Sequence, residues 1–403
     1  MKHYFLGMAA NYKGRLWAHT FAVGRERDRG ALQRFLTQKY DGQAILTKNG
    51  RSALTLALKA YFDPGDAVIV NGFTCYAVYE AVKAAGLVPV WADIGKEDLN
   101  FNVESLKRVM ESKISGDSRP YATNEERNER SSARNDGPER ASRELPKSYS
   151  EIKGIIIQNS LGNPVDIAAI EKFAKQHNLT IIEDLAHCAG VKYADGREAG
   201  TVGAAAALSF GKDKSVDTIS GGAVILRDSC KTVIKAPSKL PKISDTLRAR
   251  FYPLLGAIAR GLSYIKLGGA FMRCLVKIHW VEKSADNKLD LERKIAKFEA
   301  KLALKQLKNL KKSGEPPLRE FYLVHNRVEV LKKLQEKGYY FGGFWYEKPV
   351  SPERYYKKVH FPEDKCSVAT EVAAKIINFP TYYNKKDLEP ARKIIAEYME
   401  GEK

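Results

Sequence analysis

The sequence predicts an α/β fold, in which a mostly parallel sheet is sandwiched between helices and a smaller C-terminal α+β domain follows. Six short, continuous apolar runs are typical of strands that are buried on both faces of a sheet. Helical patterns lie between these runs, and this alternation favours parallel strands joined by helical crossovers. The apolar runs are residues 67–70, 88–91, 154–157, 180–182, 206–209 and 222–226.

Three helical patterns separate these strands, at residues 52–61, 76–85 and 167–177. Asp166 stands at the N-cap position of the third helix, where its carboxylate can accept a backbone hydrogen bond. The sequence Pro64-Gly65-Asp66 supplies the turn that leads into the first apolar run. Each helix therefore ends a few residues before the next strand begins.

The chain has 403 residues and 44% hydrophobic content, enough for a large core and a second, smaller one. We predict a large domain at 1–235, a basic amphipathic helical segment with a linking helix at 236–312, and a small C-terminal domain at 313–403. The small domain suits a lid over the cleft between the domains. Residues 111–150 lack apolar periodicity, which predicts a disordered insertion.

Positive charge is concentrated in the second half of the chain. The formal net charge is +19, and between Lys231 and Lys312 there are twenty Lys/Arg residues against six Asp/Glu, a surplus of fourteen. Such a surplus attracts nucleic acid, anionic lipid or a phosphorylated small molecule. Because no recognised nucleic-acid motif accompanies it, we predict that the protein binds no nucleic acid.

Residues 248–281 combine an apolar body with interspersed cations. Arg260, Lys266, Arg273 and Lys277 interrupt the apolar residues, so no run reaches the roughly 18 residues that a bilayer-spanning helix needs. Two interpretations stay open. The segment packs within the protein, for example as a lid at a dimer interface, or it forms an in-plane helix in peripheral contact with an anionic membrane.

The first residues and the cysteines both favour a cytoplasmic protein. Residues 1–8 contain too short an apolar run, and no small-residue cleavage pattern, for a secretory signal. The cysteines are scattered without CxxC pairs, so we expect neither a disulfide framework nor a metal site. They are Cys75, Cys188, Cys230, Cys274 and Cys366. The alternative location is the inner face of the membrane, if residues 248–281 bind lipid.

An aspartate and a lysine stand just past the ends of two predicted strands. Asp184 follows the run at 180–182, and Lys214 follows the run at 206–209. Pyridoxal 5'-phosphate (PLP) requires this pair, because the amine bonds to the cofactor aldehyde and the carboxylate keeps the pyridine nitrogen protonated. We therefore predict PLP as the cofactor and Lys214 and Asp184 as catalytic residues. Lys212 is the alternative attachment point.

Gly50, Arg51 and Ser52 stand where a helix begins. Backbone N–H groups at the positive end of a helix, together with the Ser52 hydroxyl, can bind a phosphate. We predict that these three residues bind the cofactor phosphate. A plain helix cap is the alternative.

Taken in order, the motifs resemble those of the DegT/StrS-type aminotransferases, which are PLP-dependent sugar aminotransferases of fold type I. The resemblance covers nearly the whole chain outside two insertions, and it depends on the order and spacing of the motifs rather than on any one of them. The matching segments are NGRSAL (49–54), PGD (64–66), LGNPVD (161–166), EDLAH (183–187), SFGKDK (209–214), FEAKLALKQL (298–307) and FPT (379–381).

The resemblance implies further cofactor contacts. It selects Lys214 as the attachment point, adds the Ser209 hydroxyl to the phosphate site and places His187 near the cofactor ring. The aromatic residue that stacks on the ring in the family aligns with Cys75. Tyr76, one residue further, is therefore the expected stacking residue, with Cys75 packing against the ring as the alternative.

Two further positions depart from the family pattern. Arg51 stands where the family usually has a small hydroxyl residue. The resemblance also implies a homodimer, in which a GxNxR segment of one subunit reaches the phosphate of the other. Here that register reads Asp290-Leu291-Glu292-Arg293-Lys294. The Glu292 carboxylate would repel phosphate unless Arg293 or Lys294 takes over.

The resemblance implies transfer of an amino group from glutamate to a keto sugar, nucleotide-linked, in cell-surface glycan or related biosynthesis. Family members that perform dehydration usually replace the lysine, so Lys214 favours transamination. The alternative is a non-catalytic PLP-binding or regulatory protein on the same fold. Trp345 and Tyr346 line the acceptor pocket in one interpretation and the core of the small domain in another.

Overall fold

The computed structural model describes residues 3–6, 20–114, 151–227, 230–283, 286–310, 318–341, 345–383 and 385–399. Nearly all of the insertion predicted at 111–150 lies outside these residues, apart from the end of a helix. The domain boundaries proposed above remain a prediction.

The centre of the molecule is a seven-stranded sheet in the order β2-β9-β8-β7-β6-β3-β5. All neighbouring strands are parallel except at β9, which runs antiparallel to both β2 and β8. The predicted fold class is therefore confirmed. The strands are β2 (Gln43–Thr47), β3 (Ala67–Asn71), β5 (Val88–Ala92), β6 (Ile152–Ile157), β7 (Thr180–Asp184), β8 (Ala205–Ser209) and β9 (Gly222–Leu226).

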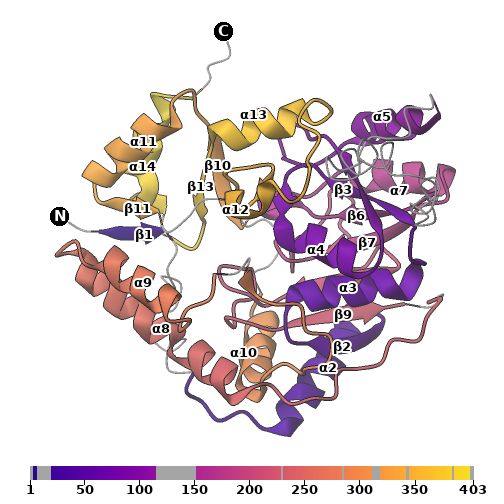
Figure 1. Ribbon diagram of the computed structural model, residues 1–403, viewed down its shortest axis with the longest axis horizontal. Helices are drawn as coiled ribbons and strands as arrows, with labels where there is room; N and C mark the ends of the chain where they lie inside the picture. Colours follow the sequence, from indigo (N-terminus) through magenta and orange to yellow (C-terminus); the bar gives the residue numbers. More distant parts are fainter. Residues whose placement is uncertain are drawn as a thin grey trace, which may run out of the picture.

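Helices cover both faces of this sheet (Figure 1). Because side chains alternate along a strand, Ile155 and Ile157 pack on one face of β6 and Ile156 packs on the other. The first face lies against α2 (Glu26–Tyr40), α5 (Val103–Ile114), α7 (Ile167–Gln176) and α10 (Lys297–Lys308). The second lies against α3 (Gly50–Tyr61), α4 (Tyr76–Ala84) and α13 (Ser367–Lys375).

The C-terminal part has a core of its own beside the sheet (Figure 1). In it, β10 (Arg319–Leu323) pairs antiparallel with β13 (Ile376–Pro380). The strand β1 (Tyr4–Leu6) pairs with β11 (Tyr339–Phe341), so the start of the chain packs on its C-terminal part. Two helices, α11 (Arg327–Glu336) and α14 (Lys385–Ala396), bury apolar side chains against these strands. The remaining short elements are β4 (Thr74–Cys75), β12 (Val350–Ser351) and α12 (Glu353–Tyr356).

The basic segment forms a helical hairpin of α8 (Ile243–Ser263) and α9 (Gly268–Lys277). One side of the hairpin packs on α10, through Tyr252 and Leu275 in a cluster with Phe298. The turn between the two helices is exposed and includes Tyr264, Ile265 and Leu267, of which Tyr264 stacks on His3 with ring centroids 4.3 Å apart. Among the helices of the described residues, none combines the length and the apolar content that crossing a bilayer requires.

Candidate active site

A cavity of about 100 Å³ lies at the carboxyl ends of β7 and β8, against the N-terminus of α3. Ligands bind at this edge in open α/β sheets. Of the predicted site residues, the cavity brings together Gly50, Arg51, Cys75, Asp184, His187, Ser209 and Lys214. Ser52 and Tyr76 do not line it.

Asp184 is the last residue of β7 and is buried. Its Oδ1 accepts the backbone N–H of Ala186 at 3.0 Å, which fixes the carboxyl group at the strand end. Burial raises the pKa of Asp184, while the Ala186 N–H and the Lys214 ammonium favour the charged form. A cation beside the Asp184 carboxylate, such as a protonated pyridine nitrogen, would offset the free-energy cost of burying its charged form.

Lys214 and Lys212 point to different parts of the molecule. Lys214 lines the same cavity as Asp184, with its Nζ 4.5 Å from the ring centroid of Trp345. Burial lowers the pKa of Lys214, while Cys75 and Asp184 raise it. A lysine with a lowered pKa is neutral more of the time, and the neutral amine is the nucleophile.

Lys212 lines a separate cavity instead. Its Nζ donates to the Glu282 carbonyl at 2.5 Å and lies 4.2 Å from the ring centroid of Tyr252. Burial lowers the pKa of Lys212 to about 8. Asp213, between the two lysines, has a positive φ of 59°, and this local turn separates their directions. Only Lys214 therefore shares a cavity with Asp184.

The N-terminus of α3 lies in close contact with the end of β8. Asn49 caps the helix, because its side chain accepts the Ser52 N–H at 2.8 Å. A Cβ added at Gly50 would lie 2.4 Å from the Cβ of Ser209, so any larger residue would force the two apart. Glycine is therefore needed here. The close approach puts the Ser209 side chain beside the positive end of α3.

Three other predicted phosphate and ring contacts have partners within the chain. The Ser52 hydroxyl donates to the Asp290 carbonyl at 2.8 Å. The Arg51 side chain reaches the cavity, but its guanidinium pairs with Glu80 and donates to the Asn287 carbonyl. Tyr76 stacks on Tyr355 with ring centroids 4.4 Å apart, whereas its neighbour Cys75 lines the cavity. Of the two residues that the sequence left open for the ring contact, the cavity therefore includes Cys75 and not Tyr76.

His187 is buried, and both of its ring nitrogens have hydrogen-bond partners. Its Nδ1 accepts the Leu161 N–H at 3.2 Å, and its Nε2 lies 3.2 Å from the Tyr346 hydroxyl. Burial, and then the charges of Lys214 and Arg319, hold the pKa of His187 well below its usual value. Because Nδ1 accepts a hydrogen bond in the neutral ring, the proton sits on Nε2 and is donated to Tyr346.

Three functional candidates come from the part of the chain after α10. Tyr346 is buried and lines the cavity, and it packs in the core of the central sheet rather than in that of the C-terminal part. Trp345 stacks on His187 with ring centroids 5.0 Å apart. Arg319, fully buried, lies 4.7 Å from the ring centroid of Trp345 and donates to Asn378 at 2.6 Å. The sequence carried no signal for Arg319.

Gln158 is a candidate that the sequence could have suggested, because it directly follows β6. Its Nε2 donates to the Phe73 carbonyl at 3.1 Å and to the Ser160 hydroxyl at 3.0 Å.

Glu292, in the register of the cross-subunit motif, is exposed and pairs with Lys239 at 2.6 Å. No residue that lines the cavity comes from the 290–294 register.

Part of the chain matches a family of known proteins. Residues 27–116 and 138–235 match the model of the DegT/DnrJ/EryC1/StrS aminotransferase family. The GDP-perosamine synthase of Escherichia coli O157:H7 is 28% identical over 196 residues, which are 48% of this chain and 43% of that protein. A pleiotropic regulatory protein of Geobacillus stearothermophilus is 28% identical over 201 residues, with the same two coverages. The chain thus spans less than half the length of the curated relatives it matches.

A solved structure is similar over almost the whole chain. The DegT DnrJ EryC1 StrS aminotransferase from Brucella abortus has a TM-score of 0.62 at 20% sequence identity, and the match covers 97% of each chain. At this identity the likeness concerns the fold, which extends beyond the two stretches matched by the family model. Through those two stretches, the chain belongs to the DegT/DnrJ/EryC1/StrS aminotransferase family.

Proposed function

We propose that the protein is a PLP-dependent aminotransferase that moves an amino group from glutamate to a keto sugar carried on a nucleotide. The observation that carries the proposal is the meeting of Lys214 and Asp184 in one cavity with the N-terminus of α3. The sugar is proposed because the Escherichia coli relative is named for GDP-perosamine, a nucleotide-linked sugar. We further propose a homodimer, for which sedimentation should give the mass of two chains.

The residues present suit this cofactor. Lys214 would hold it covalently, Asp184 would keep the proton on its ring nitrogen, and Gly50 and Ser209 would meet its phosphate. Bound PLP supplies an electron-accepting ring that stabilises the charge left when the donor loses its α-proton. Lys214, with its pKa lowered by burial, can accept that proton and deliver it again. His187 and Tyr346 form a neutral, hydrogen-bonded wall of the cavity.

Purified protein incubated with PLP is expected to show the absorbance band of a lysine-bound cofactor. Added glutamate should bleach this band and release 2-oxoglutarate in an amount equal to the cofactor bound, because the first half of transamination needs no acceptor. Glycerol or sodium chloride at the same concentration should leave the spectrum unchanged. Absence of any protein-bound band would refute the proposal.

A regulatory protein on the same fold is the second candidate, because a relative in Geobacillus stearothermophilus carries that description. The same spectra separate the two. A regulator that binds PLP would show the band but would not bleach with glutamate. An aminotransferase would show the band and would lose it when glutamate is added.

We also propose that the α8–α9 hairpin contacts an anionic membrane surface. Residues 248–281 contain six Lys/Arg and no Asp/Glu. At the tip, Tyr264, Ile265 and Leu267 are 57%, 63% and 53% exposed. Exposed apolar residues flanked by cations suit the interface of an anionic bilayer, whereas two copies of this face would repel each other.

Co-sedimentation with vesicles tests this contact. The protein should sediment with vesicles that contain phosphatidylserine at low salt, less at high salt, and not with neutral phosphatidylcholine vesicles. Ile265→Ser should lower the bound fraction, because it removes apolar surface from the tip. Val328→Ser, at a valine on α11 that is 79% exposed, is the control and should not lower the bound fraction. Equal binding by both variants would argue against the proposal.

A further inference from the structure

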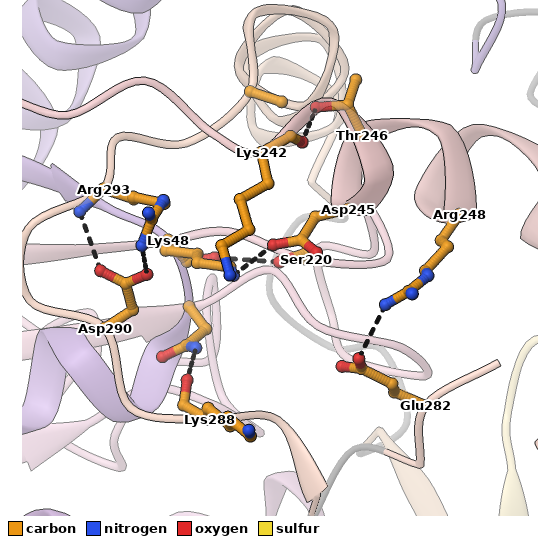
Figure 2. A network of polar contacts seen from close by, with 12 residues as sticks. Lys48, Ser220, Lys242, Asp245, Thr246, Arg248, Glu282, Lys288, Asp290 and Arg293 are labelled. Carbon is orange, nitrogen blue, oxygen red and sulfur yellow. Dashed lines mark hydrogen bonds and ion pairs between the residues drawn. The ribbon is translucent and has the colours of Figure 1, made fainter. Parts of the chain in front are cut away.

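Residues 286–290, here called the strap, lie across the N-terminus of α3. Three backbone carbonyl oxygens of the strap accept hydrogen bonds from side chains at the start of this helix. The Asn287 oxygen accepts from Arg51, the Lys288 oxygen accepts from Asn49 at 3.1 Å, and the Asp290 oxygen accepts from Ser52 at 2.8 Å. Figure 2 shows the strap at Lys288 and Asp290, near Lys48, the residue that precedes the N-cap of α3.

Both ends of the strap are fixed by carboxylates. At the C-terminal end, Asp290 Oδ1 accepts the Arg293 N–H at 3.0 Å, and the two side chains pair at 2.8 Å (Figure 2). At the N-terminal end, Asp286 Oδ1 accepts the Tyr355 hydroxyl at 2.6 Å and the Arg354 guanidinium at 2.7 Å. Arg354 and Tyr355 belong to α12. The strap is therefore held on α12 at one end and by a local turn at the other.

The strap engages the donors that a phosphate at this end of α3 would need. Backbone N–H groups at a helix N-terminus attract an anion, and the side chains of Arg51 and Ser52 lie at the same end. A phosphate oxygen and a carbonyl oxygen are both hydrogen-bond acceptors, so they compete for these donors. Asn287 of the strap also lines the cavity that contains Lys214. The strap therefore forms part of the wall of the cofactor cavity, next to the proposed phosphate site.

We infer that the strap is a gate for the cofactor, which closes the phosphate-binding end of α3 in the cofactor-free protein and leaves it when the phosphate enters. In the closed arrangement Arg51 and Ser52 donate to strap carbonyls, and in the open arrangement they donate to phosphate oxygens. The bonds between Asp286 and α12 oppose opening, because they fix the first residue of the strap. The inference rests on the proposed function for the cofactor that carries the phosphate.

Limited trypsin digestion of the cofactor-free protein measures the opening of the strap, since a protease cleaves a held segment after it has opened. Asp286→Ala should raise the rate of cleavage after Lys288 about tenfold, because it removes charge-assisted hydrogen bonds to α12. Glu353→Ala removes an exposed ion pair of the same helix and is the matched control, which should be cleaved as the unchanged protein is. Loading with PLP should also raise cleavage after Lys288, because the phosphate displaces the strap.

The rate of cofactor uptake tests whether opening admits the cofactor. Stopped-flow absorbance at the band of the lysine-bound cofactor follows uptake at increasing PLP concentration. The observed rate should level off at the rate of strap opening. Asp286→Ala should raise this limiting rate about tenfold, whereas Glu353→Ala should leave it unchanged.

Three results overturn the inference. They are equal cleavage after Lys288 in Asp286→Ala and Glu353→Ala, protection of that peptide bond by PLP, and faster cleavage of Asp286→Ala without faster uptake. Failure of the proposed function looks different, because no cofactor band then appears in the unchanged protein or in either variant. Failure of the inference alone leaves the band present in all three proteins.

Discussion

Replacing Lys214 with alanine is expected to remove the covalent link to the cofactor and to lower the rate of amino transfer at least about 100-fold. The loss follows from two roles of one amine, which holds the cofactor and moves the proton. Borohydride reduction of the cofactor-loaded protein, followed by peptide mass mapping, should find the adduct on the peptide that contains Lys214. The same treatment of Lys214→Ala should find none.

Lys212→Ala is the matched control, because Lys212 lies two residues away but lines a different cavity. It should keep the adduct at position 214 and the bleaching of the cofactor band by glutamate. An adduct on Lys212 in the unchanged protein would show that the attachment point is wrong. Activity of Lys214→Ala close to that of the unchanged protein would contradict the proposed mechanism.

The strands of the sheet could be predicted because most are buried on both faces. Continuous apolar runs such as that of β6 are then required, and their order implies parallel pairing. The strand β2 was missed. It is one of the two edge strands, it begins at an exposed Gln43, and its partner in the sheet is β9, about 180 residues later in the chain. The residues of β2 themselves do not indicate that the strand pairs with β9.

The part of the site that lies at strand ends could be predicted, since position in a strand decides it. Asp184, at the end of β7, is of this kind, whereas Gly50 begins α3 and Ser209 was expected from the family resemblance. What could not be predicted depends on contacts between distant segments. Ser52 is engaged by the Asp290 carbonyl, and Tyr346 reaches His187 across 159 residues of sequence. The order of these segments in the sequence does not indicate which of them come into contact in the folded chain.

The basic hairpin also illustrates why an amphipathic pattern leaves alternatives open. The sequence of 248–281 indicates apolar and cationic positions, but not which apolar positions find a partner. The structure divides them. Tyr252 and Leu275 are buried against Phe298, while Ile265 and Leu267 stay exposed at the tip. Packing within the protein therefore explains one side of the hairpin and leaves the turn between α8 and α9 for the proposed contact.

The largest effect on stability is expected at Glu183, the neighbour of Asp184. Because side chains alternate along a strand, the two carboxylates point to opposite faces of β7. Glu183 is fully buried and accepts four hydrogen bonds, three of them from backbone N–H groups. The donors are the Tyr193 hydroxyl at 2.9 Å, Gly200 N–H at 2.7 Å, Val202 N–H at 2.9 Å and Gly203 N–H at 2.7 Å.

Glu183→Gln keeps the shape of the side chain but turns one acceptor oxygen into an NH₂ donor. The amide would then face backbone N–H groups that have no other acceptor in this arrangement, and each unsatisfied buried donor costs roughly 1–3 kcal/mol. We expect the free energy of unfolding to fall by about 3 kcal/mol or more. Urea unfolding of the cofactor-free protein, followed by circular dichroism, measures this change.

The matched control is Glu171→Gln on α7, where the carboxylate is about one third exposed and pairs with Arg197. This change should cost about 1 kcal/mol or less, since exposed ion pairs contribute little. If Glu183→Gln unfolds at the same urea concentration and with the same slope as Glu171→Gln, the carboxylate does not hold the 200–203 loop against β7. If it is destabilised as expected, cofactor binding should weaken as well, because the loop and Asp184 are anchored at the same strand end.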